Sequence, residues 1–192
     1  MNLRRFPMPR LAFSRSAPPA DGAERFRETI LPHLDAAYGY ARYLARDPVA
    51  AEDIVQEAFL RAYRSVEGCR GNEKAWLLAI VRNCHHDWAR SSGRYRPADD
   101  AAPEPADDET PMTRLERASD IAQVRASIEA LPEPFREALV LRELEDLPYR
   151  DIAAMTGVPI GTVMSRLARA RRMLAAALLG EAPAEDKGAI AR

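Results

Sequence analysis

The segment from Tyr149 to Arg172, YRDIAAMTGVPIGTVMSRLARARR, constrains the fold of this chain more than any other stretch. It predicts two helices joined by a tight turn, because Gly157 lies where the turn needs a positive φ, which glycine adopts at little cost. Pro159 suits the entry to the second helix, where its missing N–H has no helical partner to lose. Val163 and Leu167, four residues apart, are predicted to face inward. This pattern is typical of a helix-turn-helix.

The second helix of this motif is basic on its outward side. From Pro148 to Leu178 the chain has five arginines and one aspartate, a net charge of +4. Arginine side chains on such a helix contact phosphates and base edges in the major groove of DNA. The alternative is a plain helical hairpin with a basic, solvated face. The glycine turn and the basic helix together favour DNA binding, and the outward residues are Ser165, Arg166, Arg169 and Arg172.

The composition limits the remaining possibilities. A chain of 192 residues holds one or two small domains, and two domains of about 70 residues each would have thin cores. The net charge is only −1, so any affinity for DNA has to come from local basic patches. Cys69 and Cys84 are too few for a disulfide framework, which fits a reducing, cytoplasmic location. No apolar run approaches the length of a membrane span, so no membrane insertion is expected.

Residues from about Arg25 to Trp88 read as helices joined by short turns, and nothing in them reads as a strand. Asp47 and Pro48 open one helix, in which apolar residues recur at steps of three and four. The stretch 68–72 breaks this helix, and a second apolar-periodic helix follows. This pattern predicts an all-α bundle.

Four prolines and six acidic residues, with no basic residue, lie between Pro97 and Thr113. Such a stretch cannot bury enough apolar area to fold, so we expect a linker over 97–118. Beyond it, Phe135, Ala138, Leu139 and Leu144 are predicted to form a helix that packs against the helix-turn-helix. The expected fold is therefore all-α, with two small helical domains joined by a flexible acidic linker. The expected boundaries are a disordered basic arm over 1–23, a first domain over 24–96, a second over 119–180 that contains the helix-turn-helix, and a flexible tail over 181–192.

The helix over 75–90 ends in a mixture of basic and aromatic residues, from Arg82 to Arg90. Cations there would hold phosphates while Trp88 stacks on unpaired bases, a combination that binds single-stranded DNA. The alternative is a basic helix end favoured by the helix dipole, with Trp88 in the core. Cys84, His85 and His86 do not predict a metal site, because adjacent residues on a helix point about 100° apart and three in a row cannot converge on one ion. Cys84 is interpreted as a core residue, and no metal is expected.

The helix AEDIVQEAFLRAY, residues 51–63, presents Asp53, Gln56 and Glu57 outward. One interpretation is an amphipathic helix whose acids lie near its positive end. The other is a docking face for a basic partner. The chain shows no nucleophile–base pair, no glycine-rich phosphate loop and no paired carboxylates in a pocket, so neither an enzyme nor a cofactor is expected.

Three stretches in one order now point to a known family. They are DIVQEAFLRAY over 53–63, AWLLAIVRNCHHDWAR over 75–90 and the helix-turn-helix, with the acidic linker before the last. This arrangement resembles bacterial RNA polymerase sigma factors of the sigma-70 family, in the small extracytoplasmic-function group. The likeness covers about residues 25–178, nearly the whole chain outside its two tails.

The resemblance implies a sigma factor that binds core RNA polymerase, through its clamp coiled coil and flap, and directs initiation at specific promoters. It also implies regulation by an anti-sigma factor. The residues implied to bind core polymerase are Asp53, Gln56, Glu57 and Phe59. Those implied to open and hold the −10 element are Arg82, Asn83, His86, Trp88 and Arg90. Those implied to read the −35 element are Thr162, Ser165, Arg166, Arg169 and Arg172.

The sequence departs from the family pattern at two places: Met164 stands where lysine is frequent, and His85–His86 is not a typical pair. A stand-alone helix-turn-helix regulator is one alternative, which the acidic docking helix argues against. A sigma mimic that sequesters an anti-sigma protein is another, which the two basic DNA faces argue against. The length of the linker supports a sigma factor that contacts two promoter elements. Its 22 residues, fully extended, reach roughly 75 Å, and two turns of B-DNA cover about 70 Å.

Overall fold

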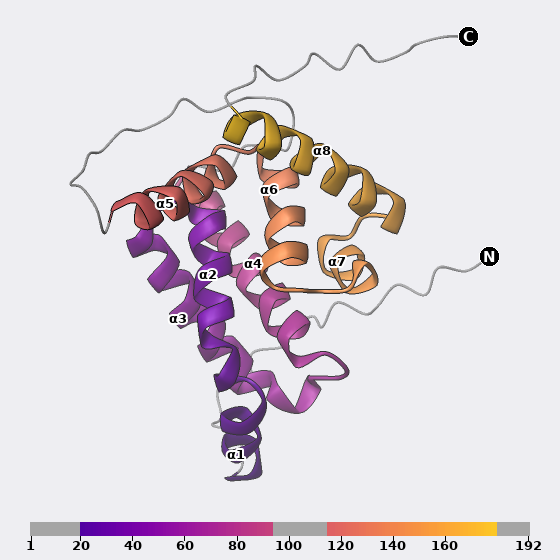
Figure 1. The fold of residues 1–192 in the computed structure, drawn as a ribbon. Coiled ribbons are helices and arrows are strands. Elements are labelled where there is room, and N and C mark those ends of the chain that lie inside the picture. The colour runs from indigo at the N-terminus through magenta and orange to yellow at the C-terminus, as the bar shows by residue number, and fades with distance from the viewer. Residues whose placement is uncertain (1–19, 94–114, 180–192) are drawn as a thin grey trace.

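A computed structural model describes residues 20–93 and 115–179 of this chain, and every regular element in these two ranges is helical. The expected all-α fold is confirmed (Figure 1). Residues 1–19, 94–114 and 180–192 lie outside the described residues, and with them most of the predicted arm over 1–23 and linker over 97–118 and all of the predicted tail over 181–192. The last residues of the predicted arm and of the predicted linker belong instead to helices that begin at Ala20 and Leu115. The N-terminal region contains α1 (Ala20–Thr29), α2 (Leu34–Ala45), α3 (Pro48–Ser65) and α4 (Glu73–Ser91), and the C-terminal region contains α5 (Leu115–Glu129), α6 (Glu133–Leu139), α7 (Tyr149–Thr156) and α8 (Ile160–Leu179).

Side-chain caps fix where the long helices of the N-terminal region begin. The Asp47 carboxylate accepts hydrogen bonds from the backbone N–H groups of Val49 and Ala50, at 2.9 and 3.2 Å. The Asn72 side chain does the same for α4, accepting from the N–H of Ala75 at 3.1 Å. Such caps satisfy N–H groups that have no partner inside the helix. The predicted opening of a helix at Asp47 and the break over 68–72 are both confirmed.

The helix-turn-helix forms as the sequence predicts. Gly157 ends α7 with φ +73°, and its N–H donates to the carbonyl of Ala153 at 3.0 Å. Helix α8 begins directly after Pro159, whose carbonyl accepts the N–H of Val163 at 3.1 Å. Val163 and Leu167 are each only 1% exposed, so the inward face of α8 is confirmed.

One detail of the C-terminal region differs from expectation. After α6 the chain winds into a π-helical turn over Val140–Leu144, in which Glu145 N–H donates to the carbonyl of Val140 at 3.0 Å. Leu144, predicted to pack against the helix-turn-helix, is 49% exposed. In a regular α-helix five residues turn through about 140°, so Leu144 would lie on a different face from the buried Leu139.

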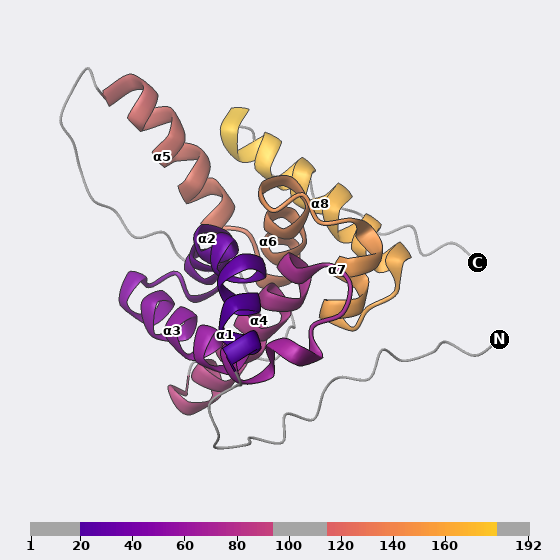
Figure 2. The same cartoon turned by 90° about the horizontal axis from the view of Figure 1, so that it is seen from below.

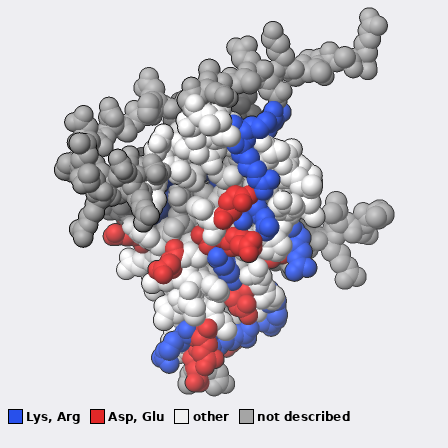
Figure 3. Space-filling view, in the orientation of Figure 1, with Lys and Arg blue, Asp and Glu red and all other residues white. Residues whose placement is uncertain are grey.

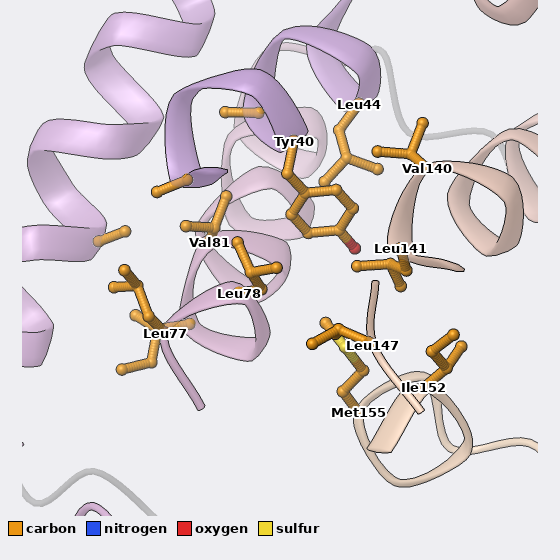
Figure 4. Packing of buried hydrophobic residues seen from close by; sticks show 14 of the residues in the cluster. Tyr40, Leu44, Leu77, Leu78, Val81, Val140, Leu141, Leu147, Ile152 and Met155 are labelled. Carbon is orange, nitrogen blue, oxygen red and sulfur yellow. The ribbon is translucent and has the colours of Figure 1, made fainter. Parts of the chain in front are cut away.

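The N-terminal and C-terminal regions share one hydrophobic core. Figure 4 shows Tyr40 and Leu78 of the first region facing Val140, Leu141 and Leu147 of the second. These five side chains are all at most 1% exposed. Figures 1 and 2 show the same arrangement at the level of helices, with α6 and α7 packed against α2 and α4. The two regions therefore form a closed arrangement in this structure.

Within residues 20–93 and 115–179, no helix is both long and apolar enough to cross a membrane.

Candidate nucleic-acid and polymerase interface

Helix α8 presents its polar residues away from the core. Ser165, Arg169 and Arg172 are exposed, while Thr162 and Arg166 are half-buried. In Figure 3 basic side chains predominate over α8, and acidic and basic groups alternate below it. The structure thus brings the predicted −35 residues together on one helix face, as major-groove binding requires.

Two neighbouring residues add detail to this face. Arg171 lies beside the predicted set, but its guanidinium binds the Glu143 carboxylate at 2.6 Å. Met164 is 53% exposed and lies about 100° around the helix from Ser165, at the edge of the predicted face. An exposed apolar side chain therefore borders the cationic face of α8.

The four residues predicted to bind core polymerase lie on two faces of α3. Gln56 and Phe59 line a groove between α2 and α3 of about 530 Å³, together with Leu34 and Tyr38. Leu34 is 43% exposed and Tyr38 37%, so this groove is apolar and open to solvent. An exposed apolar groove of this kind, with acidic residues at its rim, is typical of a protein-binding site. The residues that line it are Leu34, Asp35, Tyr38, Glu52, Val55, Gln56 and Phe59.

Asp53 and Glu57 lie instead in a second groove, between α3 and α4. Glu57 binds Arg61 at 2.7 Å, and Arg61 also binds Asp87 of α4 at 2.8 Å. Trp88 lines the same groove. Glu57 therefore helps to position Arg61, which joins α3 to α4.

The five residues predicted for the −10 element do not all share one face of α4. Successive residues of an α-helix are about 100° apart, so Arg82, His86 and Arg90 form one stripe, with Asn83 at its edge. Trp88 lies about 160° from His86 on the same reckoning, and accordingly it lines the α3–α4 groove. The predicted stacking residue and the predicted phosphate-binding residues are therefore on opposite sides of the helix.

Arg82 does not face solvent in this closed arrangement. Its Nε donates to Oε1 of Glu137 in α6 at 2.6 Å, and the Tyr40 hydroxyl donates to the same oxygen at 2.9 Å. Glu137 is only 5% exposed and Tyr40 is fully buried. Burial lowers the pKa of Arg82, but the charge and hydrogen bond of Glu137 outweigh it, so the net shift is upward. Burial, followed by Glu137, raises the pKa of Tyr40 well above its ordinary value.

Two further polar contacts join the regions at the other end of α4. Lys74 Nζ binds the Glu145 carboxylate at 2.7 Å and also donates to the Glu145 carbonyl at 2.9 Å. Asn72 Nδ2 donates to the Asp151 carboxylate of α7 at 3.0 Å. Glu145 is 8% exposed. The closed arrangement is thus held by charge-assisted hydrogen bonds as well as by the shared core.

The two adjacent histidines, His85 and His86, lie where α4 faces α6. His85 is 6% exposed, its Nδ1 has no hydrogen-bond partner, and burial, followed by the neighbouring His86, lowers its pKa to about 4. Burial and then Arg82 lower the pKa of His86 as well. Both rings are therefore neutral at pH 7.

The same junction contains a group with the residue types of a metal site. Among the described residues, His85, His86 and Glu133 each offer one ligand atom within 4.8 Å of the others. Glu133 comes from α6, so this group differs from the run of three neighbours considered in the sequence. Neighbouring Zn²⁺ ligand atoms need to lie about 3.4 Å apart, given bonds of about 2.0–2.1 Å. The prediction of no metal stays a prediction.

Both cysteines are core residues rather than exposed thiols. Cys69 is 2% exposed and Cys84 is 3% exposed, and neither forms a disulfide. Burial raises the pKa of Cys84 to about 11 and that of Cys69 above its usual value. A protonated, buried thiol reacts slowly with oxidants, so the structure does not favour a redox-sensing role.

The polar residues that join the two regions were not found from the sequence. Glu137 and Glu145 are acidic residues among apolar neighbours in α6 and the turn after it, and Tyr40 is a polar-tipped residue in an apolar helix. The sequence feature that could have indicated these contacts is a charged residue at a position that the helical period assigns to the core. Such a residue needs a buried polar partner, but the sequence does not identify that partner.

Comparison with known proteins defines the class of this protein. Residues 29–95 match the family description "Sigma-70 region 2", and residues 121–174 match "Sigma-70, region 4". The chain is 37% identical over 145 residues to the ECF RNA polymerase sigma-E factor of Haemophilus influenzae, covering 69% of this chain and 76% of that protein. It is also 37% identical over 153 residues to the ECF RNA polymerase sigma factor SigE of Mycolicibacterium smegmatis, covering 77% of this chain but only 59% of that protein. The chain belongs to the sigma-70 family of RNA polymerase sigma factors, in the extracytoplasmic-function group.

A solved structure gives the same fold. The sigma factor RpoE of Bartonella quintana, determined in complex with the anti-sigma factor NepR, is similar with a TM-score of 0.65 and 29% identity. The similarity covers 81% of this chain and 98% of that one. Both regions of the present chain therefore have counterparts in a sigma-factor structure.

Proposed function

We propose that this sigma factor docks on core RNA polymerase through α3, holds the melted −10 element on α4 and reads the −35 duplex with α8. The observation that carries the proposal is the presence, in one chain, of both sigma-70 regions together with a row of outward polar and basic residues on α8. The polymerase performs the phosphoryl chemistry. This chain supplies the choice of promoter and stabilises the opened strand.

The proposed contacts follow from the chemistry of each face. Core polymerase binds along α3, with its apolar contacts in the Gln56–Phe59 groove and its basic groups near Asp53 and Glu57. The melted −10 strand binds the stripe of Arg82, Asn83, His86 and Arg90 on α4, and stacking on Trp88 requires the strand to reach the opposite side of the helix. The −35 duplex receives Thr162, Ser165, Arg166, Arg169 and Arg172 in its major groove.

We also propose a protein regulator, an anti-sigma factor, and a domain division at the linker as first expected. The support for a regulator is that the similar RpoE of Bartonella quintana was solved in complex with an anti-sigma factor. The stretch between α4 and α5, residues 92–114, is long enough to let the two regions reach separate promoter elements, since its full extension is roughly 75 Å.

Run-off transcription from a pool of genomic promoter fragments tests this function. Purified core polymerase is assayed with and without the full chain, and new discrete transcripts that require the chain are the expected result. The transcripts would also reveal the −35 and −10 sequences. Failure to bind core polymerase together with a lack of such transcripts would overturn the proposal and favour a stand-alone regulator.

A further inference from the structure

Two helices that are distant in the sequence bring three side chains of metal-binding type together. His85 and His86 come from α4, and Glu133 is the first residue of α6. One nitrogen of each imidazole and one carboxylate oxygen lie within 4.8 Å of one another. The sequence argument against a metal considered neighbours on a single helix, whereas this group takes its third member from the other region of the chain.

We propose that His85, His86 and Glu133 form a binding site for Zn²⁺, with water completing the coordination of the ion. Two imidazoles and one carboxylate are a donor set that zinc uses in sites with three protein ligands. Imidazole nitrogen also disfavours Mg²⁺ and Ca²⁺, which prefer oxygen ligands. The proposal does not depend on the polymerase and promoter contacts proposed above, although His86 belongs to both sets of residues.

The spacing of the two histidine rings is close to that around a shared zinc ion. Their centroids are 5.7 Å apart, and the ring planes are inclined by 55°. Two imidazoles on one tetrahedral zinc ion, with Zn–N bonds of about 2.0–2.1 Å, have centroids about 5 Å apart. Ligand atoms on such an ion are about 3.4 Å apart, so the 4.8 Å limit leaves a contraction of about 1.4 Å at most. Glu133 is half-buried, and rotation between its side-chain rotamers supplies a movement of this size.

The cations nearest to this group are bound elsewhere. Arg82 Nε donates to the Glu137 carboxylate, one turn further along α6, at 2.6 Å. Arg136 Nη1 donates to two backbone carbonyls at the α5–α6 turn, at 3.0 and 2.7 Å. Both guanidinium groups thus have hydrogen-bond partners other than Glu133, so an ion in the site does not have to displace either of them.

The His85 ring has an unsatisfied nitrogen. The residue is 6% exposed, and its Nδ1 has no hydrogen-bond partner among the residues that the structure describes. Buried polar atoms in proteins nearly always have such a partner. Binding of an ion through this nitrogen would satisfy it.

The test is isothermal titration calorimetry of Zn²⁺ into the full, untagged chain after metal has been removed with a chelator. The expected result is saturable binding of one ion per chain, and no comparable binding of Mg²⁺. Glu133→Gln, which keeps the shape of the side chain and removes its charge, should weaken Zn²⁺ binding at least about tenfold, and so should His86→Gln. Loss of a residue that only orients a ligand already costs about 10- to 100-fold in metal affinity.

Two control variants match these changes away from the site. His33→Gln removes the third histidine of the chain. Asp146→Asn makes the same change in net charge as Glu133→Gln, at a side chain that is 89% exposed and binds Arg142. Asparagine also tolerates the positive φ of 50° at this position. Both controls should bind Zn²⁺ with the affinity of the parent.

Co²⁺ in place of Zn²⁺ identifies the donor atoms. The visible absorption of the bound ion reports its coordination geometry, and a thiolate ligand adds a charge-transfer band in the near ultraviolet. Cys69 and Cys84 are both buried and lie outside the proposed site. The expected spectrum therefore lacks the thiolate band.

Four results would overturn the site: a parent chain that binds no Zn²⁺, parental affinity in folded Glu133→Gln and His86→Gln, loss of binding in His33→Gln, or a thiolate band with Co²⁺. Circular dichroism establishes which variants are folded. If one ligand variant does not fold, the other variant and the Co²⁺ spectrum of the parent decide.

Discussion

Removal of the Tyr40 hydroxyl should measure how strongly the two regions are joined. In Tyr40→Phe the ring that fills the shared core remains, and only the donor to Glu137 is lost. The hydroxyl is fully buried and lies 2.9 Å from the carboxylate oxygen, so water cannot replace it without opening the junction. A hydrogen bond to a charged group contributes about 1.5–3 kcal/mol. We expect the free energy of unfolding to fall by that amount.

Urea unfolding of the full chain, followed by circular dichroism and by tryptophan fluorescence, gives this free energy. Both tryptophans, Trp76 and Trp88, belong to the N-terminal region, so the two signals coincide only if the regions unfold together. Tyr63→Phe is the control. The Tyr63 ring packs edge-on against Phe26 at 5.2 Å, and its loss of a hydroxyl should cost no more than about 0.5 kcal/mol.

A double-mutant cycle separates the hydrogen bond from other effects of Tyr40→Phe. If the hydroxyl acts through Glu137, the combined Tyr40→Phe and Glu137→Gln variant should be less destabilised than the sum of the two single variants. Additive effects, or a loss below about 0.5 kcal/mol for Tyr40→Phe alone, would refute the reasoning.

Three further results are expected. The pKa of His85 is lowered by burial to about 4, so the native state holds the neutral ring; stability is complete above the ordinary value of 6.5 and falls as the pH drops toward 4. The loss should reach about 3 kcal/mol by pH 4, and His85→Gln should flatten that part of a stability-against-pH curve. Arg166→Ala should weaken −35 discrimination by about 1–3 kcal/mol, measured by competition between matched and altered duplexes; no loss relative to the exposed Arg27→Ala control would contradict the placement of α8. Finally, Cys84 should resist a thiol reagent at pH 8 in the folded chain and react on unfolding, because burial raises its pKa to about 11; fast labelling of the native protein would show that the site opens.

Much of the local structure could be read from the residues themselves. The aspartate–proline pair at Asp47, the turn at Gly157 and the inward pair of Val163 and Leu167 all lie where the sequence places them. Each depends on interactions within a few residues, such as a cap, a backbone angle or a helical period. Leu144 shows the limit of this approach, because an apolar residue five positions after the buried Leu139 lies about 140° around the helix from it and is 49% exposed.

The candidate sites were predicted residue by residue, but their arrangement was not. The sequence grouped Trp88 with Arg82 and His86, whereas the fold places Trp88 beside Asp53 and Glu57 in a different groove. It grouped Gln56 and Phe59 with those acids, yet the structure puts them against α2. Closeness along a helix does not decide which neighbour covers each face.

The sequence by itself determined an all-helical fold, the helix that opens at Asp47, the helix-turn-helix and the family to which its three motifs belong, because these depend on short-range patterns and on ordered motifs. Only the tertiary structure decided that Glu137 meets Tyr40 and Arg82, which are 97 and 55 residues away along the chain. A buried carboxylate needs partners, but any of many donors would satisfy that need. The choice is made by how two helical regions pack, and that packing depends on the whole shared core.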